Sequence, residues 1–407
     1  MSEKNFRVLV LTPIYPGEGV MKSTTPVVHF FVREWIKHNV DVRVIHYPSN
    51  FPLVFRWIAK LFQKQIENRL GSDIRTWRLK EQEYTLDGVK VYRFPLTKMK
   101  PHSRYSSKAI DNAIRKTMDY CEKECFTPDV IVSHWANPQL EIMHSLKANY
   151  GTPTCFVTHD NGHDLCGIYS KEKAIYLEET NLIGYRSESI RHHFEKSFDC
   201  ASKPHFQCYS GIPAKYVEDI KKKIKERNSI IFVGSLIERK YPKELLRATA
   251  SVHGKDGFRL TYIGTGADEQ SLLKEAARLG VSDNVHLMGR IPRDEVVRQM
   301  DAHTIFAMIS RNEAFGLVYL EAMARGCITI ASRDEGFDGI IQDGENGFLC
   351  KAGDTEELSS ILEKIKNMPQ TDIQQISDNA VKTAHVLTDE KVAMDYLEHL
   401  KTISEEA

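Results

Sequence analysis

The chain has 407 residues, more than a single hydrophobic core usually holds, so its length predicts two domains. It carries 55 basic and 55 acidic residues, and this net charge of zero excludes the strongly basic surface of a general nucleic-acid-binding protein. No run of about 18 apolar residues occurs, and the apolar part of the N-terminal MSEKNFRVLVL is too short for a signal peptide.

Eight cysteines occur without a CxxC pair or an even spacing. Cys155, Cys327 and Cys350 lie in apolar stretches, which favours reduced thiols in a core over a disulfide framework. We therefore expect a cytoplasmic protein.

Strand-like apolar runs alternate with helical patterns along the chain, which is typical of parallel sheets with crossover helices. The expected strands of the first half are 7–11, 40–46, 89–94, 130–133 and 154–158, and those of the second half are 230–233, 259–263, 285–288, 304–308 and 328–331. We expect an α/β fold in which two Rossmann-like domains face a cleft, with ligands at the carboxyl ends of the strands.

The segment EAFGLVYLE, residues 313–321, places two carboxylates on either side of an Ala-Phe-Gly turn. A buried strand is expected at 302–309 before it, and a helix at 315–325 that stops at Gly326. Glu313 then lies in a strand-to-helix loop, where the helix N-terminus offers N–H groups to a diphosphate. Glu321 would reach a ribose diol, because ionised carboxylates accept hydrogen bonds from hydroxyls. The alternative is that Glu313 replaces an N-cap residue and Glu321 is a solvated helix charge.

With its flanking segments, this motif resembles the retaining GT-B glycosyltransferases of family 4, continuously from about 229 to 349 and more weakly over the first half. VGSLIERK at 233–240 is similar to the family's phosphate-binding loop, YIGTG at 262–266 to its second glycine turn, and VHLMGRIPRDE at 285–295 to its base-binding segment. The family usually has Arg after the first glycine of the phosphate loop. This chain has Ser235 there, with Arg239 beside Lys240 instead.

The resemblance implies that Glu313 contacts the donor sugar, Glu321 the ribose, and Lys240 the diphosphate, with Arg239 as a further cation. The implied catalytic residues are His134, Lys240, Arg239 and Glu313, and the implied donor-binding residues are Gly17, Gly234, Ser235, Gly264, Gly266, Arg290, Ile291, Ala314, Phe315, Gly316, Leu317 and Glu321. Fixed cations stabilise a leaving diphosphate. Since no Asp-x-Asp motif follows a strand, neither a metal nor another cofactor is expected. The alternative is that Arg239 and Lys240 form a solvated charge pair.

Two features of the first half concern the ligands of the expected cleft. The loop TPIYPGEG at 12–19 contains Gly17 and is followed by a polar stretch at 22–26, which favours an ordinary turn at Gly17 over a direct donor contact. His134 directly follows an expected strand and resembles the histidine of the family's acceptor domain. We expect it to be exposed there and to bind an acceptor hydroxyl, with a structural histidine as the alternative.

The segment THDNGHD at 158–164 allows a rival function. His159, Asp160, His163 and Asp164 have the ligand chemistry of a divalent metal site and resemble HD-type phosphohydrolases, with His192 and His193 as further ligands by composition alone. Those enzymes carry their His-Asp pair on helices, whereas CFVTHD predicts a strand entering a loop. We therefore assign His159 and Asp160 to the acceptor side of the cleft, with a loop-ordering pair as the alternative.

The segment FPLVFRWIAKLFQK at 51–64 predicts a helix with a wide apolar surface and a basic stripe of Arg56, Lys60 and Lys64. Such helices lie in the headgroup region of anionic membranes. The alternative is a helix packed on the sheet.

The sequence thus predicts a peripheral glycosyltransferase on the inner face of the plasma membrane that transfers a sugar from a nucleotide diphosphate, UDP first, to a glycan or lipid-linked acceptor. The alternatives are a metal phosphohydrolase, a non-catalytic nucleotide-sugar-binding protein, and an epimerase on the same fold. The expected divisions are an acceptor domain at 1–214, a linker at 215–228, a nucleotide-sugar domain at 229–385, and a C-terminal helix at 386–407 that packs back towards the first domain. No nucleic-acid partner is expected.

Overall fold

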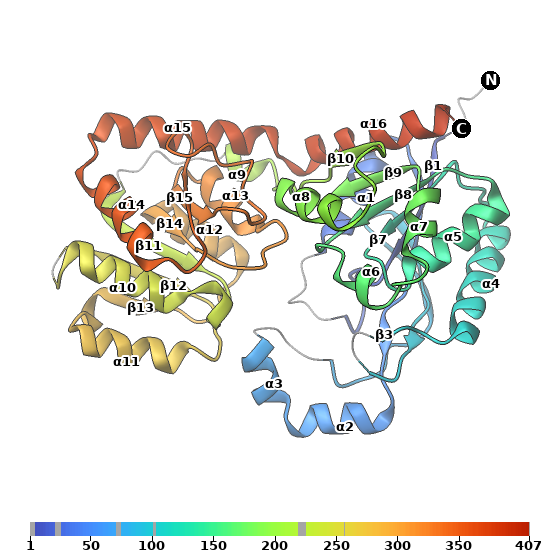
Figure 1. Cartoon of the computed structure of the whole chain (residues 1–407), viewed down its shortest axis with the longest axis horizontal. Helices are drawn as coiled ribbons and strands as arrows, with labels where there is room; N and C mark the ends of the chain where they lie inside the picture. Colours follow the sequence, from blue (N-terminus) through green and yellow to red (C-terminus); the bar gives the residue numbers. More distant parts are fainter. Residues whose placement is uncertain are drawn as a thin grey trace.

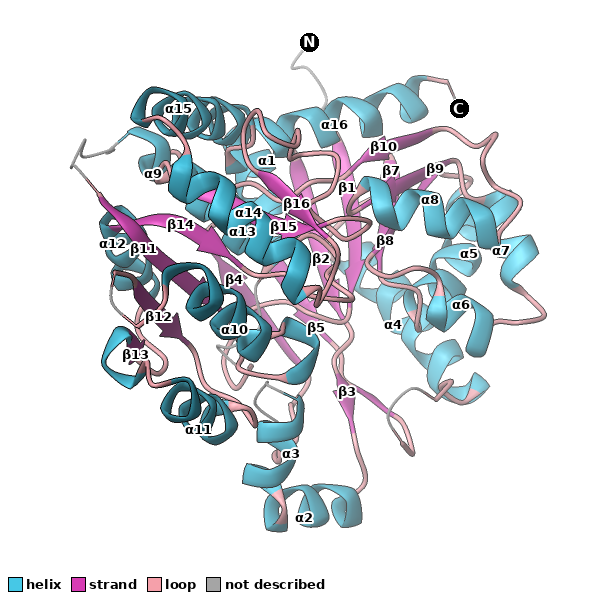
Figure 2. Cartoon of the chain, turned by 60° about the vertical axis from the view of Figure 1, so that its left-hand side comes forward, coloured by secondary structure: helices cyan, strands magenta, loops and turns pink. Residues whose placement is uncertain are grey.

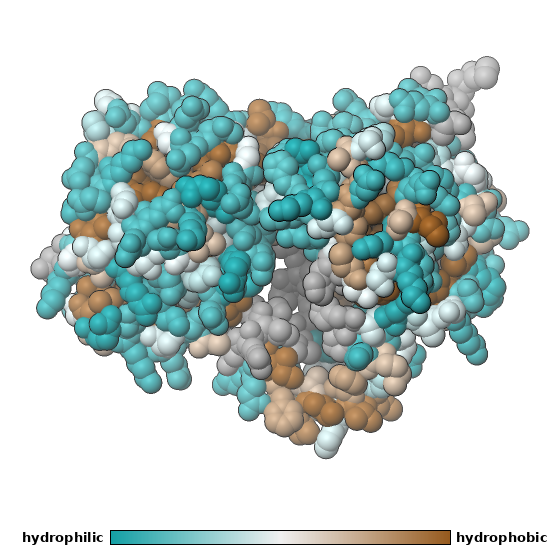
Figure 3. Space-filling model, in the orientation of Figure 1, coloured by the Kyte–Doolittle hydropathy of each residue, from teal (hydrophilic) through white to brown (hydrophobic). Residues whose placement is uncertain are grey.

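The computed structural model describes residues 5–20, 26–70, 75–100, 103–218, 225–255 and 257–406. It contains two large sheets in two lobes that lie side by side, with helices on both sheet faces (Figures 1 and 2). The molecular surface is hollowed between the lobes (Figure 3). The structure therefore has the predicted α/β architecture of two Rossmann-like domains that face a cleft.

The N-terminal sheet has the strand order β10-β9-β8-β7-β1-β2-β5-β4. Its strands are β1 (Arg7–Thr12), β2 (Asp41–His46), β4 (Gln82–Leu86), β5 (Val89–Arg93), β7 (Val130–His134), β8 (Thr154–Thr158), β9 (Leu182–Tyr185) and β10 (His205–Gln207). All pair in parallel except the edge strand β4, which is antiparallel to β5. The order reverses between β1 and β7, so the loops after these two strands frame a crevice.

Helices and a small accessory sheet complete this lobe. The helices are α1 (Val27–Lys37), α2 (Leu53–Leu61), α3 (Gln63–Leu70), α4 (Ser107–Lys123), α5 (Gln139–Tyr150), α6 (His163–Gly167), α7 (Lys173–Glu179) and α8 (Glu188–Ser197), and β3 (Ser49–Asn50) pairs with β6 (Leu96–Thr97). Ser106 and Ser187 cap α4 and α8, because each side chain accepts a backbone N–H of the first turn.

The C-terminal sheet is wholly parallel, with the order β13-β12-β11-β14-β15-β16. Its strands are β11 (Glu226–Val233), β12 (Arg259–Ile263), β13 (Val285–Leu287), β14 (His303–Ala307), β15 (Ile328–Ser332) and β16 (Phe348–Cys350). This is the strand order of dinucleotide-binding folds, and it reverses between β11 and β14. A ligand is therefore expected between the loops that follow those two strands.

The elements around this sheet are α9 (Lys215–Glu218), η1 (Glu238–Lys240), α10 (Pro242–His253), α11 (Glu269–Leu279), η2 (Ser282–Asn284), α12 (Arg293–Ala302), α13 (Leu317–Ala324), α14 (Thr355–Asn367) and α15 (Gln370–Val386). The helix predicted at 315–325 is α13, and Gly326 follows its end with a φ of +67°, a conformation that favours glycine.

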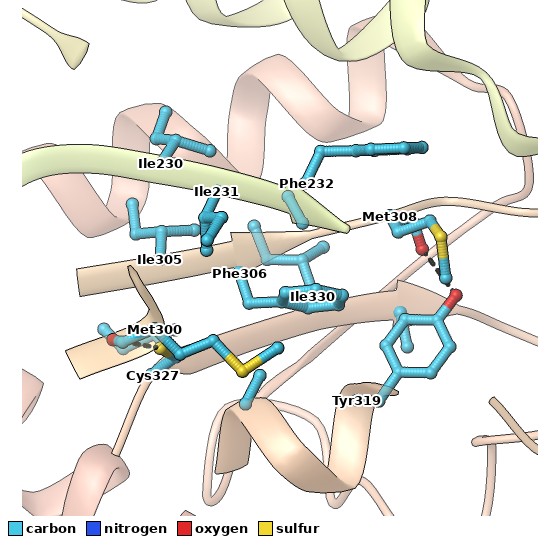
Figure 4. Close-up of a cluster of buried hydrophobic side chains, with 14 of the residues drawn as sticks. Ile230, Ile231, Phe232, Met300, Ile305, Phe306, Met308, Tyr319, Cys327 and Ile330 are labelled. Atoms are coloured by element: carbon cyan, nitrogen blue, oxygen red, sulfur yellow. Dashed lines mark hydrogen bonds between the residues drawn. The ribbon is translucent and has the colours of Figure 1, made fainter. Parts of the chain in front are cut away.

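Apolar side chains from β11, β14, β15 and α13 form the core beneath the loops of the C-terminal sheet (Figure 4). Tyr319 of α13 is fully buried in this cluster, yet its hydroxyl donates a hydrogen bond to the backbone carbonyl of Met308 (2.8 Å; Figure 4). The start of α13 is therefore tied to the end of β14.

The chain crosses between the lobes twice, and the two crossings lie side by side. Ile212 donates its N–H to Leu387 O (3.1 Å), and Asp389 donates its N–H to Ile212 O (2.8 Å). A Cβ on Gly211 would lie 2.4 Å from the Asp389 nitrogen, so this approach requires glycine. After the second crossing, α16 (Asp389–Glu405) packs on α1 of the N-terminal lobe (Figure 1).

All ten predicted strands are confirmed to within a few residues, although β11 begins at Glu226 rather than at residue 230. Four strands of the two large sheets were not predicted. β4 is an exposed edge strand with an alternating burial pattern, and β9, β10 and β16 have only three or four residues each, too short for a distinct pattern. Part of the segment predicted as the linker, 219–224, and part of the polar stretch at 22–26 lie outside the described residues.

The prediction of free cysteines is confirmed, since all eight are unpaired and Cys155, Cys327 and Cys350 are buried. No helix among the described ranges is both long and apolar enough to cross a membrane.

Candidate donor site

Two glycine-containing loops, after β11 and β12, meet at the carboxyl edge of the C-terminal sheet. Gly264, after β12, has a φ of +136°, and a Cβ there would lie 2.0 Å from Gly234 O, after β11. Gly234 donates its N–H to Ile263 O (2.9 Å), and Leu236 donates its N–H to Thr265 O (3.0 Å). These loops are packed backbone to backbone, and a Cβ on Gly266 would lie 2.2 Å from Leu236 O, so the chain needs glycine at 264 and 266. A Cβ on Gly234 would instead meet side chains, with Lys240 Cδ at 3.3 Å.

The loops after β11 and β14 bring two cations to one carboxylate. Lys240 Nζ lies 3.2 Å from Glu313 Oε2, and an Arg239 guanidinium nitrogen lies 3.7 Å from the same oxygen. The side chains of Lys240 and Glu313 are only 12% and 17% exposed, whereas that of Arg239 is 40% exposed. Lys240 is therefore a largely buried partner of Glu313, and the alternative of a solvated charge pair is wrong for Lys240. Arg239, also in η1, contacts the same Glu313 oxygen.

Glu313 is also held by hydrogen bonds to Ser310 and Glu335. Ser310 Oγ donates to Glu313 Oε2 (3.4 Å) and lies 2.8 Å from the Tyr319 hydroxyl. The Glu313 backbone N–H donates to Glu335 Oε2 (2.8 Å). A Cβ on Gly336 would lie 2.4 Å from Glu313 O, so the loop after β15 closes over the loop after β14.

The N-terminus of α13 has no side-chain cap, and its N-cap residue is Gly316 with a φ of +82°. Glu313 does not serve as an N-cap substitute, because its carboxylate faces Lys240 and Ser310 instead. The first N–H groups of α13 are thus left for a ligand such as a phosphate.

Glu321 is buried on α13 and is paired with Arg293, the first residue of α12. Arg293 Nε donates to Glu321 Oε1 (2.7 Å), and its Nη2 contacts the same oxygen. Burial raises the pKa of the Glu321 carboxyl, and the Arg293 charge opposes this rise. The alternative of a solvated helix charge is wrong, since the side chain is only 8% exposed.

The other predicted donor-site residues border this centre. Arg290 is exposed and donates to Thr265 Oγ1 (3.1 Å), while Ile291 and Leu317 are half-buried against the domain core. Ser235 lies in the loop after β11, where its carbonyl accepts the Ile237 N–H (3.0 Å).

Ala314 and Phe315 face the other lobe. Ala314 packs against the N-terminal core, and the buried Phe315 ring lies 5.6 Å from the guanidinium of Arg186 and 5.8 Å from the ring of Tyr209. The loop after β14 thus also forms part of the contact between the lobes.

Gly17 lies in the N-terminal lobe, far in the sequence from Lys240 and Glu313, and packs against a residue of its own lobe. A Cβ there would lie 2.6 Å from the Tyr84 hydroxyl, which donates to Pro16 O (2.6 Å). Val20 donates its N–H to Gly17 O (3.1 Å), as in a turn.

The prediction that His134 is exposed at the end of its strand is wrong. His134 is fully buried, shares a hydrogen bond with His159 (3.1 Å), and lies 3.5 Å from the Tyr396 hydroxyl of α16. Burial, with the nearby charge of Arg186, lowers the pKa of His134 to about 3. The imidazole is therefore neutral and forms its hydrogen bonds within the fold.

His159 and Asp160 follow β8 as predicted, in a strand-to-loop junction. The His159 ring stacks on Trp135 at 3.6 Å, and Asp160 Oδ1 accepts the Gly162 N–H (2.6 Å). Asp160 thus orders its loop, while His159 is partly exposed and contacts His134 at the end of β7.

Within the described side chains, no group of three or more His, Cys, Asp or Glu residues is placed to hold a metal ion. His192 and His193 are exposed on α8. The side chains of His163 and Asp164 lie outside the described residues. The metal-site alternative therefore gains no support from the described geometry.

The sequence reasoning missed Arg293, Glu335 and Arg186. Glu335 follows a buried strand, as Glu313 does, so its position in the sequence could have identified it as a residue of the site. Arg293 lies within the segment matched to the base-binding loop, but its partner is 28 residues away. Arg186 is buried, with its guanidinium donating to Cys208 O and Ser210 Oγ, and nothing in its local sequence indicates this.

Comparison with known proteins agrees with this geometry. Residues 217–383 match the family model described as Glycosyl transferases group 1. The chain is 31% identical over 154 residues to the lipopolysaccharide core biosynthesis glycosyltransferase LpsE of Rhizobium meliloti, over 38% of this chain and 41% of that protein. It is 30% identical over 126 residues to N-acetyl-alpha-D-glucosaminyl L-malate synthase of Bacillus anthracis, over 31% of this chain and 32% of that protein. The matched part of the chain thus spans about two fifths or less of the length of these curated relatives.

Solved structures match over nearly the whole chain. Sucrose-phosphate synthase from Thermosynechococcus elongatus has a TM-score of 0.71 at 14% identity, over 99% of this chain and 100% of its own. Anabaena HepE in complex with UDP and glucose has a TM-score of 0.65 at 16% identity, over 98% of this chain and 100% of its own. These likenesses establish the GT-B fold.

Proposed function

We propose that this protein is a retaining glycosyltransferase that transfers a sugar from a UDP-sugar to a glycan or lipid-linked acceptor. The observation that carries the proposal is the meeting of Lys240 and Arg239 with Glu313, from the loops after β11 and β14, beside the uncapped start of α13. In a parallel sheet this is the point where the strand order reverses and where ligands bind.

The three side chains divide the reaction between them. When the bond from the anomeric carbon to the diphosphate breaks, its electron pair remains on the diphosphate oxygen. Lys240, Arg239 and the first N–H groups of α13 stabilise that charge. Glu313 accepts hydrogen bonds from the donor sugar and exchanges its contact with Lys240 for them. The acceptor hydroxyl forms the new bond to the anomeric carbon, and its proton passes to the departing diphosphate.

The relatives favour a particular donor and acceptor. HepE was crystallised with UDP and glucose, and LpsE acts in lipopolysaccharide core biosynthesis. These relatives support UDP as the nucleotide and a polysaccharide or glycolipid as the product. Since His134 is buried, the acceptor binds without it, beside His159 in the crevice between β1 and β7.

An apolar surface on α2 supports a membrane-bound acceptor on the cytoplasmic face. α2 has no buried residue, and the exposed fractions of Leu53, Trp57, Leu61 and Phe62 are 75%, 66%, 59% and 51%. These side chains form an apolar patch at the bottom of the molecule, below the opening between the lobes (Figures 1 and 3). Lys60 and Lys64 are exposed beside them. A helix packed on the sheet is ruled out, and an exposed apolar helix with lysines suits an anionic leaflet.

A thermal-shift screen with UDP, GDP and ADP in the presence of EDTA tests the proposal. A ligand at about a hundred times its Kd adds about 2.7 kcal/mol to the free energy of unfolding. We expect UDP to raise the midpoint without metal, and UDP-sugars to be consumed when membrane glycolipids are supplied. Stabilisation that requires a divalent ion would contradict the metal-independent mechanism, and UDP-sugar binding without turnover would instead indicate a non-catalytic binder.

A further inference from the structure

The two carboxylate oxygens of Glu321 differ in their contacts to the protein. Both Arg293 contacts go to Oε1, and among the described residues no hydrogen bond or ion pair uses Oε2. The carboxylate is nearly buried, and a buried ionised carboxylate is costly unless it is paired. Arg293 supplies that pairing at Oε1.

Arg293 is itself held in place at the crossing between the lobes. Its guanidinium lies 5.4 Å from the centre of the Tyr216 ring, in α9 just after the first crossing. Asp389, at the second crossing, is close enough for the Arg293 charge to lower the pKa of its carboxyl, although burial raises that pKa overall. These contacts and the pair with Glu321 orient the guanidinium relative to α13, although the Arg293 side chain is 38% exposed.

The charged groups that face Glu321 are Arg293 and Asp389, and they act in opposite directions. Burial raises the pKa of Glu321, the positive charge of Arg293 lowers it, and the negative charge of Asp389 raises it. Without Arg293 the carboxyl would take up a proton at a higher pH. A protonated carboxyl uses one oxygen as a donor and accepts a hydroxyl less well.

We propose that Arg293 is a positioning residue that holds Glu321 for a ribose diol, and that this pair selects ribonucleoside over 2′-deoxyribonucleoside diphosphates. The inference rests on the proposed function, since it places a nucleotide at the reversal point of the C-terminal sheet. Arg293 acts through Glu321 and does not itself touch the ribose.

Calorimetric titration of the full chain with UDP and with 2′-deoxy-UDP tests the proposal. The wild type is expected to bind UDP about tenfold more tightly, because a charge-assisted hydrogen bond to the 2′-hydroxyl is lost in the deoxy compound. In Arg293→Gln, the preference for UDP over 2′-deoxy-UDP should disappear, because UDP loses its contact to the 2′-hydroxyl and is weakened more than 2′-deoxy-UDP. The UDP affinity of this variant should weaken further as the pH falls. Arg293→Lys should restore part of the preference. Arg298→Gln, at an exposed position of the same helix, is the matched control.

The outcomes separate this inference from the proposed function. If no nucleotide binds the wild type, the proposed function fails. If the wild type binds UDP without preference over 2′-deoxy-UDP, or if Arg293→Gln keeps the preference, the assignment of Arg293 is overturned and the donor site stands. Equal weakening of both ligands in Arg293→Gln, with the same loss in Arg293→Lys, would show a purely structural role and would also overturn the assignment.

Discussion

Lys240 Nζ and Glu313 Oε2 lie 3.2 Å apart although the residues are 73 positions apart in the chain. One follows β11 and the other follows β14, so the ion pair spans the point where the strand order of the C-terminal sheet reverses. Ser310, Tyr319 and Glu335 fix the acidic partner, and the arrangement is therefore set before any donor arrives.

Replacing Lys240 by Met is expected to lower turnover by about a hundredfold or more, because the leaving diphosphate loses a fixed cation. It should also lower the free energy of unfolding by about 1–3 kcal/mol, since Glu313 loses its nearer partner. Steady-state kinetics and urea unfolding measure the two effects.

Lys37→Met is the matched control for stability. Lys37 pairs at 2.7 Å with the buried Glu34, which also has an arginine neighbour, but it lies at the end of α1. Because the Lys37 side chain is 59% exposed and that of Lys240 only 12%, a smaller loss of stability with full turnover is expected there. If Lys240→Met retained wild-type turnover, the leaving-group role would belong to Arg239 or to another group.

Replacing Trp57, Lys60 and Phe62 together by Ser should release the protein from anionic vesicles and leave UDP binding intact. The two aromatic side chains are 66% and 51% exposed, so the free energy of unfolding should change little. Sedimentation with phosphatidylglycerol vesicles measures the release. The same substitution at Leu273, Lys274 and Val386, which are exposed on the C-terminal lobe, is the control. A wild type that does not sediment with such vesicles would argue for a soluble acceptor.

Buried neutral histidines should make the protein sensitive to acid. His134 has a pKa of about 3 in the fold, against 6.5 ordinarily, so the unfolded chain takes up a proton that the folded protein does not. Its contribution to stability is complete above pH 6.5 and is lost as the pH falls towards 3, by about 1.4 kcal/mol per pH unit. His134→Gln should reduce the slope of unfolding free energy against pH by that amount between about pH 6 and pH 4.5. The exposed His192→Gln should leave the slope unchanged, and an unchanged slope in His134→Gln would mean that His134 is charged or exposed.

The sequence was sufficient for the architecture because buried parallel strands appear as continuous apolar runs. It also predicted that ligands gather at the carboxyl ends of the strands, where Lys240 and Glu313 lie, but it did not predict their direct ion pair. The edge strand β4 and the short strands β9, β10 and β16 lack such runs, so they could not be recognised.

Contacts between distant segments could not be predicted. His134 ends its strand as expected, but Tyr396 of α16 and Phe31 of α1 bury it, and neither is near it in the chain. In the same way, the partner of Glu321 depends on where α12 begins relative to α13. The sequence motif identifies the carboxylate, and only the packing identifies Arg293.

The most direct test of the donor site is titration of Glu313→Gln and Glu321→Gln with UDP in the presence of EDTA, followed by turnover of a UDP-sugar. We expect Glu321→Gln to weaken UDP binding by about tenfold or more, because the ribose diol loses a charge-assisted bond. Glu313→Gln should bind UDP nearly as the wild type does and should lose sugar transfer, because only the donor sugar reaches it. Equal losses of UDP affinity in the two variants would contradict the assignment of Glu313 to the sugar and leave the pair as joint support for the loop.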